Sequence, residues 1–239
     1  MTEQVVFAAA NGAEVSGRLA IPAGNDVSRS PALILVHEAF GLNTHIEALA
    51  ERFASLGFLT LAVDLFGGKT AATLGPAMEL VKQMKTAEAM EIIAGAVKLL
   101  ASHSRGNSKV GITGFCLGGG MALAAACNID GLSASVPFYG LPLPQFQDWS
   151  RAQASQVPIQ GHFSTTDPHI TKDRVQAATA AAVAAGVNIQ IFFYEGGHGF
   201  MRDTDPEAYH AESARLAWER MLAFLRKHLS ITPTPIAAV

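Results

Sequence analysis

KVGITGFCLGGGMALAAA, residues 109–126, is the stretch of sequence that decides the fold. Residues 109–113 form a short apolar run typical of a buried strand, and the small residues after position 117 favour a closely packed helix. Between them, Gly114-Phe115-Cys116-Leu117-Gly118 has the G-x-S-x-G spacing of a sharp strand-to-helix turn, with sulfur in place of oxygen. Such a turn strains the backbone of its central residue, and the flanking glycines avoid collisions. Cys116 is therefore a candidate nucleophile; the alternative is a glycine-rich turn around a structural cysteine.

The segments around this stretch alternate between apolar runs and helical patterns, which predicts an α/β fold with a mostly parallel central sheet and helices on both faces. Two runs flanking Asn11-Gly12, a tight-turn signal, predict an antiparallel hairpin at one edge of the sheet. We expect strands at 4–9, 14–20, 32–36, 58–63, 109–113, 134–138, 159–163 and 188–194. We expect helices at 43–56, at 76–85, in a further segment ending near 100, at 171–185 and at 209–228. A turn-rich excursion at 67–75 is a candidate part of a lid.

Composition and charge narrow the class of protein. The 239 residues are 49% hydrophobic and 15% charged, which predicts a single domain spanning 1–239, with a loosely held tail at 230–239. A net charge of -3 without any Lys/Arg-rich run argues against a nucleic-acid partner. The absence of a signal-peptide pattern and of a long apolar stretch predicts a cytoplasmic protein with no membrane partner. Cys116 and Cys127 lie too far apart along one predicted helix for a disulfide.

An acidic residue and a histidine follow the cysteine in the order that a nucleophile-acid-histidine triad requires. Asp167 comes just after the predicted strand 159–163, and His198 follows the strand 188–194 in the glycine-rich loop Gly196-Gly197-His198-Gly199. The alternatives are a turn-forming aspartate before Pro168 and a solvated loop histidine. A metal site at His162, Asp167 and His169 is a weaker interpretation, because His162 falls inside a predicted strand. We expect no metal and no cofactor.

Glu38 follows the strand 32–36, in the place where a loop that binds an oxyanion belongs. The N–H of Ala39 in this loop and the N–H of Leu117 at the helix start are candidate oxyanion-hole donors. The helix N-terminus favours a thiolate at Cys116, whereas a facing Glu38 would oppose its ionisation and accept its proton. The alternative is that Glu38 is a surface residue capping the next helix.

Four motifs together make the sequence resemble the dienelactone hydrolases (carboxymethylenebutenolidases), a family of the α/β-hydrolase superfamily. They are residues 37–43 (HEAFGLN), residues 114–119 (GFCLGG), the Asp167 segment, and residues 197–200 (GHGF) with Arg202 shortly after. The resemblance covers essentially the whole chain and implies an α/β-hydrolase fold.

This resemblance also implies roles for individual residues. Cys116 attacks a lactone or ester, His198 and Asp167 handle proton transfer, and Glu38 holds the resting thiol and takes its proton when substrate binds. Leu117 and Ala39 stabilise the oxyanion. Arg202, Tyr139 and Phe40 are then candidate substrate-binding residues.

One departure from the family pattern affects the expected substrate. Members that act on dienelactone bind its carboxylate with two arginines, and Arg202 matches the one after the catalytic histidine. Residues 67–87 hold lysines but no arginine at the place of the other, so the clamp for a planar carboxylate is incomplete. Either a lysine takes the place of the missing arginine or the acyl group of the substrate is neutral.

Two other functions stay open, a general esterase and a non-catalytic cysteine sensor. We expect a monomer or small homo-oligomer.

Overall fold

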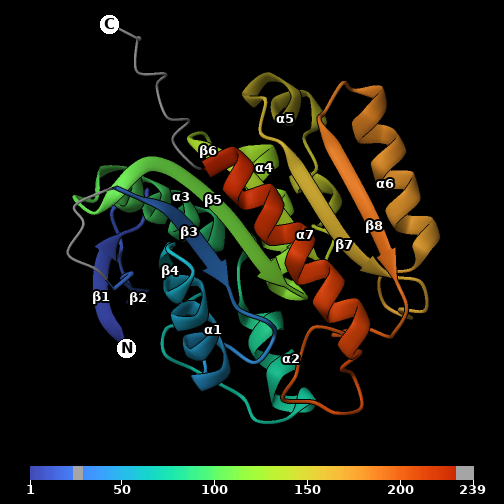
Figure 1. The fold of residues 1–239 in the computed structure, drawn as a ribbon, viewed down its shortest axis with the longest axis horizontal. Helices are drawn as coiled ribbons and strands as arrows, with labels where there is room; N and C mark the ends of the chain where they lie inside the picture. Colours follow the sequence, from blue (N-terminus) through green and yellow to red (C-terminus); the bar gives the residue numbers. More distant parts are fainter. Residues whose placement is uncertain (24–28, 230–239) are drawn as a thin grey trace, which may run out of the picture.

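The computed structural model describes residues 1–23 and 29–229, and these form one eight-stranded sheet covered by helices on both faces (Figure 1). The strand order is β1-β2-β4-β3-β5-β6-β7-β8. The hairpin and its pairing with β4 are antiparallel, and all pairs from β4 to β8 are parallel. The strands are β1 (Thr2–Ala8), β2 (Glu14–Ala20), β3 (Ser30–Val36), β4 (Leu59–Val63), β5 (Gly106–Phe115), β6 (Leu132–Phe138), β7 (Ile159–Ser164) and β8 (Ile189–Tyr194).

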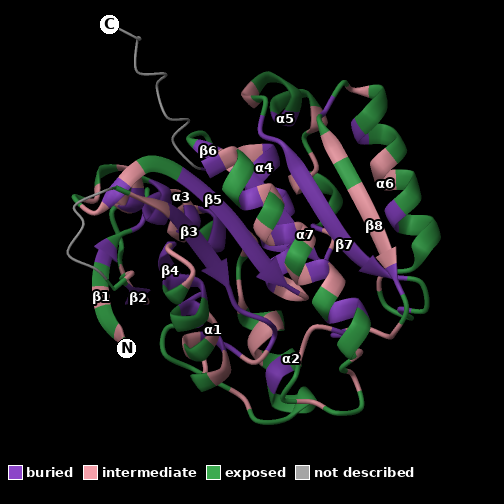
Figure 2. Ribbon diagram, in the orientation of Figure 1, coloured by how far each residue is buried: buried purple, intermediate pink, exposed green. Residues whose placement is uncertain are grey.

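The helices divide between two faces of the sheet, and the central strands are buried beneath them (Figure 2). They are α1 (Thr44–Ser55), α2 (Leu74–Gln83), α3 (Thr86–Ser102), α4 (Leu117–Asn128), α5 (Trp149–Ser155), α6 (Lys172–Ala184) and α7 (Ala211–Leu229). Helices α1 and α7 pack with one apolar cluster, and α3 and α4 with the other. Alternate residues of β3 enter opposite clusters, Leu33 and Leu35 on one side and Ile34 and Val36 on the other. This explains its continuous apolar run.

The predicted fold class, hairpin and parallel core are confirmed, with differences at some boundaries. Strand β5 extends beyond the predicted 109–113 at both ends. Helix α5 and a 3-10 turn at Pro144–Phe146 were not expected. Helix α5 has seven residues and buries only Ala152, so it carries no detectable apolar periodicity; its start is set by the Asp148 side chain, which accepts from the N–H of Arg151. The predicted tail at 230–239 lies outside the described residues.

Glycines at the start of α4 allow this helix to approach the sheet closely. A Cβ at Gly118 would meet the carbonyl oxygen of Val36 in β3, and a Cβ at Gly119 would meet that of Phe138 in β6, both closer than real Cβ contacts come. The backbone oxygens of β3 and β6, the two strands on either side of β5, therefore fix the position of the helix that begins after Cys116.

Gly119→Ala should accordingly destabilise the fold by about 2–3 kcal/mol, because a methyl group there forces the helix away from β6. Urea unfolding followed by circular dichroism measures this. Gly75→Ala is the matched control: it lies within α2, where an added Cβ has nothing within 4 Å. We expect that variant to be as stable as the natural chain or slightly more stable. Equal stability losses in the two variants would contradict the packing argument.

Candidate active site

The candidate catalytic residues follow the carboxyl ends of parallel strands, where sites in open α/β sheets are found. Glu38 comes after β3, Cys116 directly after β5, Asp167 after β7 and His198 after β8. Because these strands are parallel neighbours in one sheet, their carboxyl ends share one edge, and residues distant in sequence converge there.

Cys116 has a strained backbone, with φ 55° and ψ −114°, as expected at the corner between β5 and α4. Its own N–H donates to the carbonyl of Phe138, at 3.1 Å, and its carbonyl accepts from the N–H of Gly120, at 3.1 Å. These two bonds hold the turn between the sheet and the helix. Cys116 is partly exposed, whereas Cys127 is buried, and both are free cysteines. Burial raises the pKa of the Cys127 thiol to about 12, so Cys127 is the inert member of the pair.

Asp167 orients His198. Its Oδ2 lies 2.7 Å from Nδ1 of His198, and its Oδ1 accepts from the N–H groups of His169, at 2.8 Å, and Ile170, at 3.0 Å. Burial alone would raise the pKa of Asp167, but these hydrogen bonds outweigh it and keep the pKa below the ordinary value. One carboxylate oxygen therefore stabilises the turn while the other fixes the imidazole.

His198 lies between Asp167 and Cys116. Burial lowers its pKa, but hydrogen bonds to Asp167 and to Cys116, together with the charges of both groups, raise the pKa to about 10. The loop that carries His198 is anchored upstream, because the hydroxyls of Ser164 and Thr166 both donate to the carbonyl of Gly196. His198 is thus hydrogen-bonded to Asp167 and lies near Cys116, so the structure brings the three candidate residues together.

A pH titration followed by NMR should show the effect of Asp167 and Cys116 on His198 as a raised pKa of its imidazole. We expect His198 to hold its proton at neutral pH and to lose it as the pH rises through about 10. His162 is the internal control, since burial lowers its pKa to about 3 and its ring should stay neutral throughout. Cys116→Ser removes the sulfur beside His198 and should lower the midpoint of His198. A midpoint near the ordinary 6.5 in the natural chain would contradict the Cys116–His198 pairing.

Glu38 is buried and contacts Tyr139 and Arg202. The Tyr139 hydroxyl lies 3.5 Å from Oε1 of Glu38, and Nε of Arg202 lies 3.6 Å from Oε2. Burial raises the pKa of Glu38, and the charge of Arg202 opposes that rise. Within the described residues, no hydrogen bond joins Glu38 to Cys116. The surface-cap alternative for Glu38 is wrong, because the residue is buried and the side chain of Asn43 caps α1.

His37 was not singled out from the sequence, although it fixes the loop that contains Glu38. It is fully buried; its Nδ1–H donates to the carbonyl of Glu38, at 2.6 Å, and its Nε2 accepts from the N–H of Leu65, at 3.1 Å. One neutral tautomer satisfies both bonds, and burial lowers the pKa of His37 accordingly. Because a trans peptide directs its C=O and N–H in opposite directions, anchoring this carbonyl also fixes the N–H of Ala39. The hydrogen bonds of the described residues give neither this N–H nor that of Leu117 a protein acceptor.

A cavity of about 460 Å³ lies beside Glu38. It is lined by Glu38, Phe40, Asn43, His45, Ala71, Ala72, Thr73, Leu74, Arg202, Thr204, Asp205 and Pro206. The predicted substrate-binding residues Phe40 and Arg202 are thus part of one cavity. Tyr139 lies deeper: it is buried, and its ring packs edge-on against that of His198 at 5.2 Å. The start of α2 forms one wall, so part of the excursion expected as a lid borders the cavity.

The metal interpretation finds no support in residues 1–23 and 29–229. No group of three or more His, Cys, Asp or Glu side chains there is arranged to hold an ion. The ring of His162 instead lies within hydrogen-bond distance of Tyr194, at 2.8 Å, and Gln160, at 3.1 Å.

In residues 1–23 and 29–229, no helix is long and apolar enough to cross a membrane.

A mostly parallel sheet of this order, with a sharp strand-to-helix turn after β5, is the α/β-hydrolase fold, and the candidate acid after β7 and histidine after β8 follow the order typical of that fold. The crystal structure of a protein named as a dienelactone hydrolase from Klebsiella pneumoniae subsp. pneumoniae has a TM-score of 0.81 to this chain at 27% identity. The match covers 94% of this chain and 99% of that one.

The profile of the dienelactone hydrolase family matches residues 15–229, and the chain belongs to that family. A Yersinia pestis protein named as a carboxymethylenebutenolidase is 31% identical over 219 residues, covering 86% of this chain and 81% of its own. A Bradyrhizobium protein named as a 2-oxo-3-(5-oxofuran-2-ylidene)propanoate lactonase is 29% identical, covering 84% of this chain and 85% of its own. The chain is thus a carboxylic-ester hydrolase, and the resemblance inferred from the sequence is confirmed.

Proposed function

We propose that this protein opens a lactone, or cleaves a small carboxylic ester, through a covalent acyl-Cys116 intermediate. The observation that carries the proposal is the hydrogen bond between Asp167 and His198, with His198 near Cys116 at the start of α4. A thiol at a helix N-terminus, beside an imidazole oriented by a buried carboxylate, is the arrangement that nucleophilic catalysis needs.

In the first half of the proposed reaction, the Cys116 thiol gives its proton to Glu38, the sulfur attacks the acyl carbon, and the carbonyl oxygen gains the negative charge. The N–H groups of Leu117 and Ala39 stabilise this oxyanion. When the carbon–oxygen bond breaks, the leaving oxygen takes a proton from His198; in a lactone this oxygen stays attached to the acyl chain. In the second half, His198 takes a proton from water, which attacks the thioester. The carbon–sulfur bond breaks, the carboxylic acid leaves and ionises, and the sulfur regains its proton from Glu38.

We propose that Glu38 controls the ionisation of Cys116, as the family resemblance implies. Burial raises the pKa of its carboxyl, so Glu38 can accept a proton more readily than an exposed glutamate. In this structure it contacts Tyr139 and Arg202, so accepting the thiol proton requires its side chain to turn toward Cys116.

The wider setting of the protein is also a proposal. We propose a single-domain cytoplasmic enzyme that works as a monomer or small homo-oligomer, with a small molecule rather than a membrane or nucleic acid as its partner. Two free cysteines suit a reducing compartment.

Intact mass measurements separate this proposal from a cysteine sensor. On mixing with p-nitrophenyl hexanoate and quenching in acid, we expect one acyl group per chain, lost in Cys116→Ala and retained in Cys127→Ala. With a catalyst the adduct decays while p-nitrophenol continues to form, whereas a sensor keeps its adduct and stops after one turnover. A panel of lactones and unrelated esters, compared by kcat/KM, then separates lactonase from general esterase activity.

A further inference from the structure

The cavity beside Glu38 has its charges paired within the protein. Arg202 is the only lysine or arginine among the described residues that line it. Its Nε lies 3.6 Å from Glu38, and its NH1 group lies 3.6 Å from Oδ2 of Asp205. The guanidinium also lies over the ring of Phe40, with 4.9 Å between the Cζ atom and the ring centroid. One cation is thus shared between two carboxylates, so the formal charges of Arg202, Glu38 and Asp205 sum to −1.

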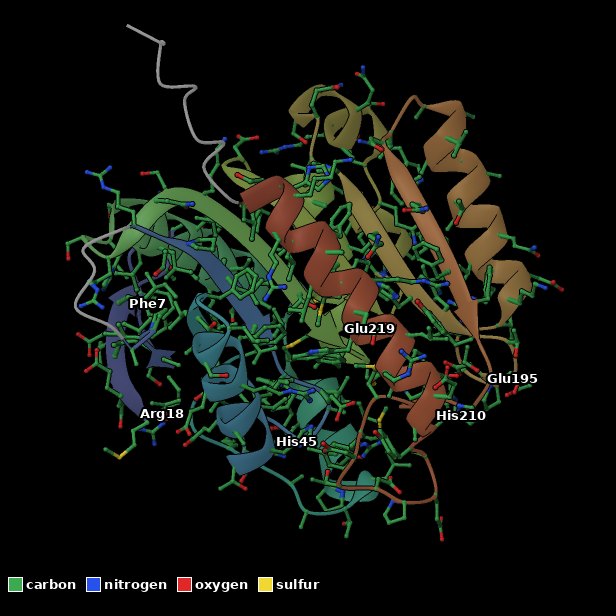
Figure 3. The ribbon with its side chains drawn as sticks, in the orientation of Figure 1. Phe7, Arg18, His45, Glu195, His210 and Glu219 are labelled. Atoms are coloured by element: carbon green, nitrogen blue, oxygen red, sulfur yellow. The ribbon has the colours of Figure 1, made fainter. Side chains whose placement is uncertain are left out.

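Asp205 is held in place rather than being a freely moving surface acid. Its Oδ1 accepts from the N–H groups of Glu207, at 3.2 Å, and Ala208, at 3.4 Å. This leaves Oδ2 for Arg202. The loop that carries both residues precedes α7 and lies beside α2, which supplies the opposite wall (Figure 1). Figure 3 shows the labelled His45, another lining residue, at the start of α1. The carboxylate of Asp205 is therefore preorganised next to the only strong cation of the cavity.

This arrangement works against an anionic substrate. A carboxylate placed on Arg202 would meet the charges of Glu38 and Asp205 within a few ångströms, and would have to displace Asp205 from a turn that holds it. The remaining lining offers apolar contact from Phe40, Ala71, Leu74 and Pro206 and neutral polar contact from Asn43, Thr73 and Thr204, beside His45. The buried Nε of Arg202 has no hydrogen-bond partner within the described residues, so a neutral carbonyl or hydroxyl oxygen of a substrate can accept from it without adding charge.

We infer that Asp205 is a specificity residue that makes the cavity select uncharged acyl groups over acyl groups bearing a carboxylate. The inference rests on the proposed function, since it concerns which ester or lactone reaches Cys116. It deepens that function by assigning a substrate class: lactones or esters whose acyl part carries no charge. It also assigns a cause of this selectivity: Asp205 competes with a substrate carboxylate for the guanidinium of Arg202.

The test uses two esters of equal length, p-nitrophenyl hexanoate and mono-p-nitrophenyl adipate, which differ by a terminal methyl group against a carboxylate. We expect the natural enzyme to have a lower kcat/KM for the adipate ester. Asp205→Asn should raise the ratio of adipate to hexanoate kcat/KM by about tenfold. Asparagine keeps the Oδ1 acceptor of the turn, so the loop is preserved. Asp203→Asn, the same charge change on the same loop at a residue that pairs with His45 rather than with Arg202, should change the ratio much less.

A second measurement needs no variant. In the natural enzyme, added salt should raise the adipate-to-hexanoate ratio, because it screens the repulsion, and Asp205→Asn should lose most of this dependence. An adipate preference in the natural enzyme, or equal changes of the ratio in Asp203→Asn and Asp205→Asn, would overturn the inference while leaving the proposed function intact. Failure to turn over either ester through Cys116 would overturn both.

Discussion

Replacing Cys116 with alanine should lower kcat/KM for p-nitrophenyl hexanoate by about 10⁴-fold or more. The variant keeps the candidate oxyanion donors and the cavity but loses the atom that forms the acyl bond. Only direct attack by water is then available, and water is a much weaker nucleophile than the sulfur. Steady-state kinetics measure the loss, and circular dichroism confirms that α4 is retained.

Cys127→Ala is the matched control for this prediction, because it removes the other thiol from the same helix, where the side chain is buried. We expect near-natural kcat/KM with a small loss of stability. Cys116→Ser should keep a little ester activity, since its hydroxyl occupies the same place with much weaker nucleophilicity. Full activity in Cys116→Ala would exclude Cys116 as the nucleophile.

Asp167→Asn should lower kcat/KM by about 10³-fold. The asparagine oxygen can keep the bonds from the N–H groups of His169 and Ile170, which directs its NH₂ group toward Nδ1 of His198. Because this group donates, the imidazole must accept at Nδ1 and carry its proton on the nitrogen that faces Cys116. It then cannot take a proton from the water that attacks the thioester. The NMR midpoint of His198 should also fall, since the hydrogen bond that raises its pKa is lost.

Asp148→Asn provides the comparison for this substitution. Asp148 caps α5 by accepting from the N–H of Arg151, so the same chemical change there affects a helix start remote from the triad residues. We expect unchanged kcat/KM. A similar loss of activity in both variants would mean that Asp167→Asn acts through stability rather than through the tautomer of His198.

The sequence was sufficient for the parts of the site that local rules control. The spacing of glycines around Cys116 has a single backbone solution, and parallel strands bring Asp167 and His198 to the same edge of the sheet whatever their loops do. These features follow from short-range sterics and from topology, and both can be read along the chain.

Features that depend on side-chain partners across loops could not be predicted. Nothing near Arg202 in the sequence indicates that Asp205 and Glu38 both pair with it, because the pairing depends on the path of the loop before α7. The role of His37 was missed for a similar reason. Its partner Leu65 follows β4, and the hydrogen bond exists only once β3 and β4 are side by side.

The convergence of Glu38, Cys116, Asp167 and His198 from four strand ends has a consequence for how this protein acquires activity. Strands β3, β5, β7 and β8 must all be in register before the four side chains meet, so most of the contacts that define the site are distant in sequence and form slowly. Partly ordered chains would have their helices and yet hydrolyse nothing. Recovery of ester hydrolysis after dilution from urea should therefore follow the slowest kinetic phase, making turnover a reporter of completed folding.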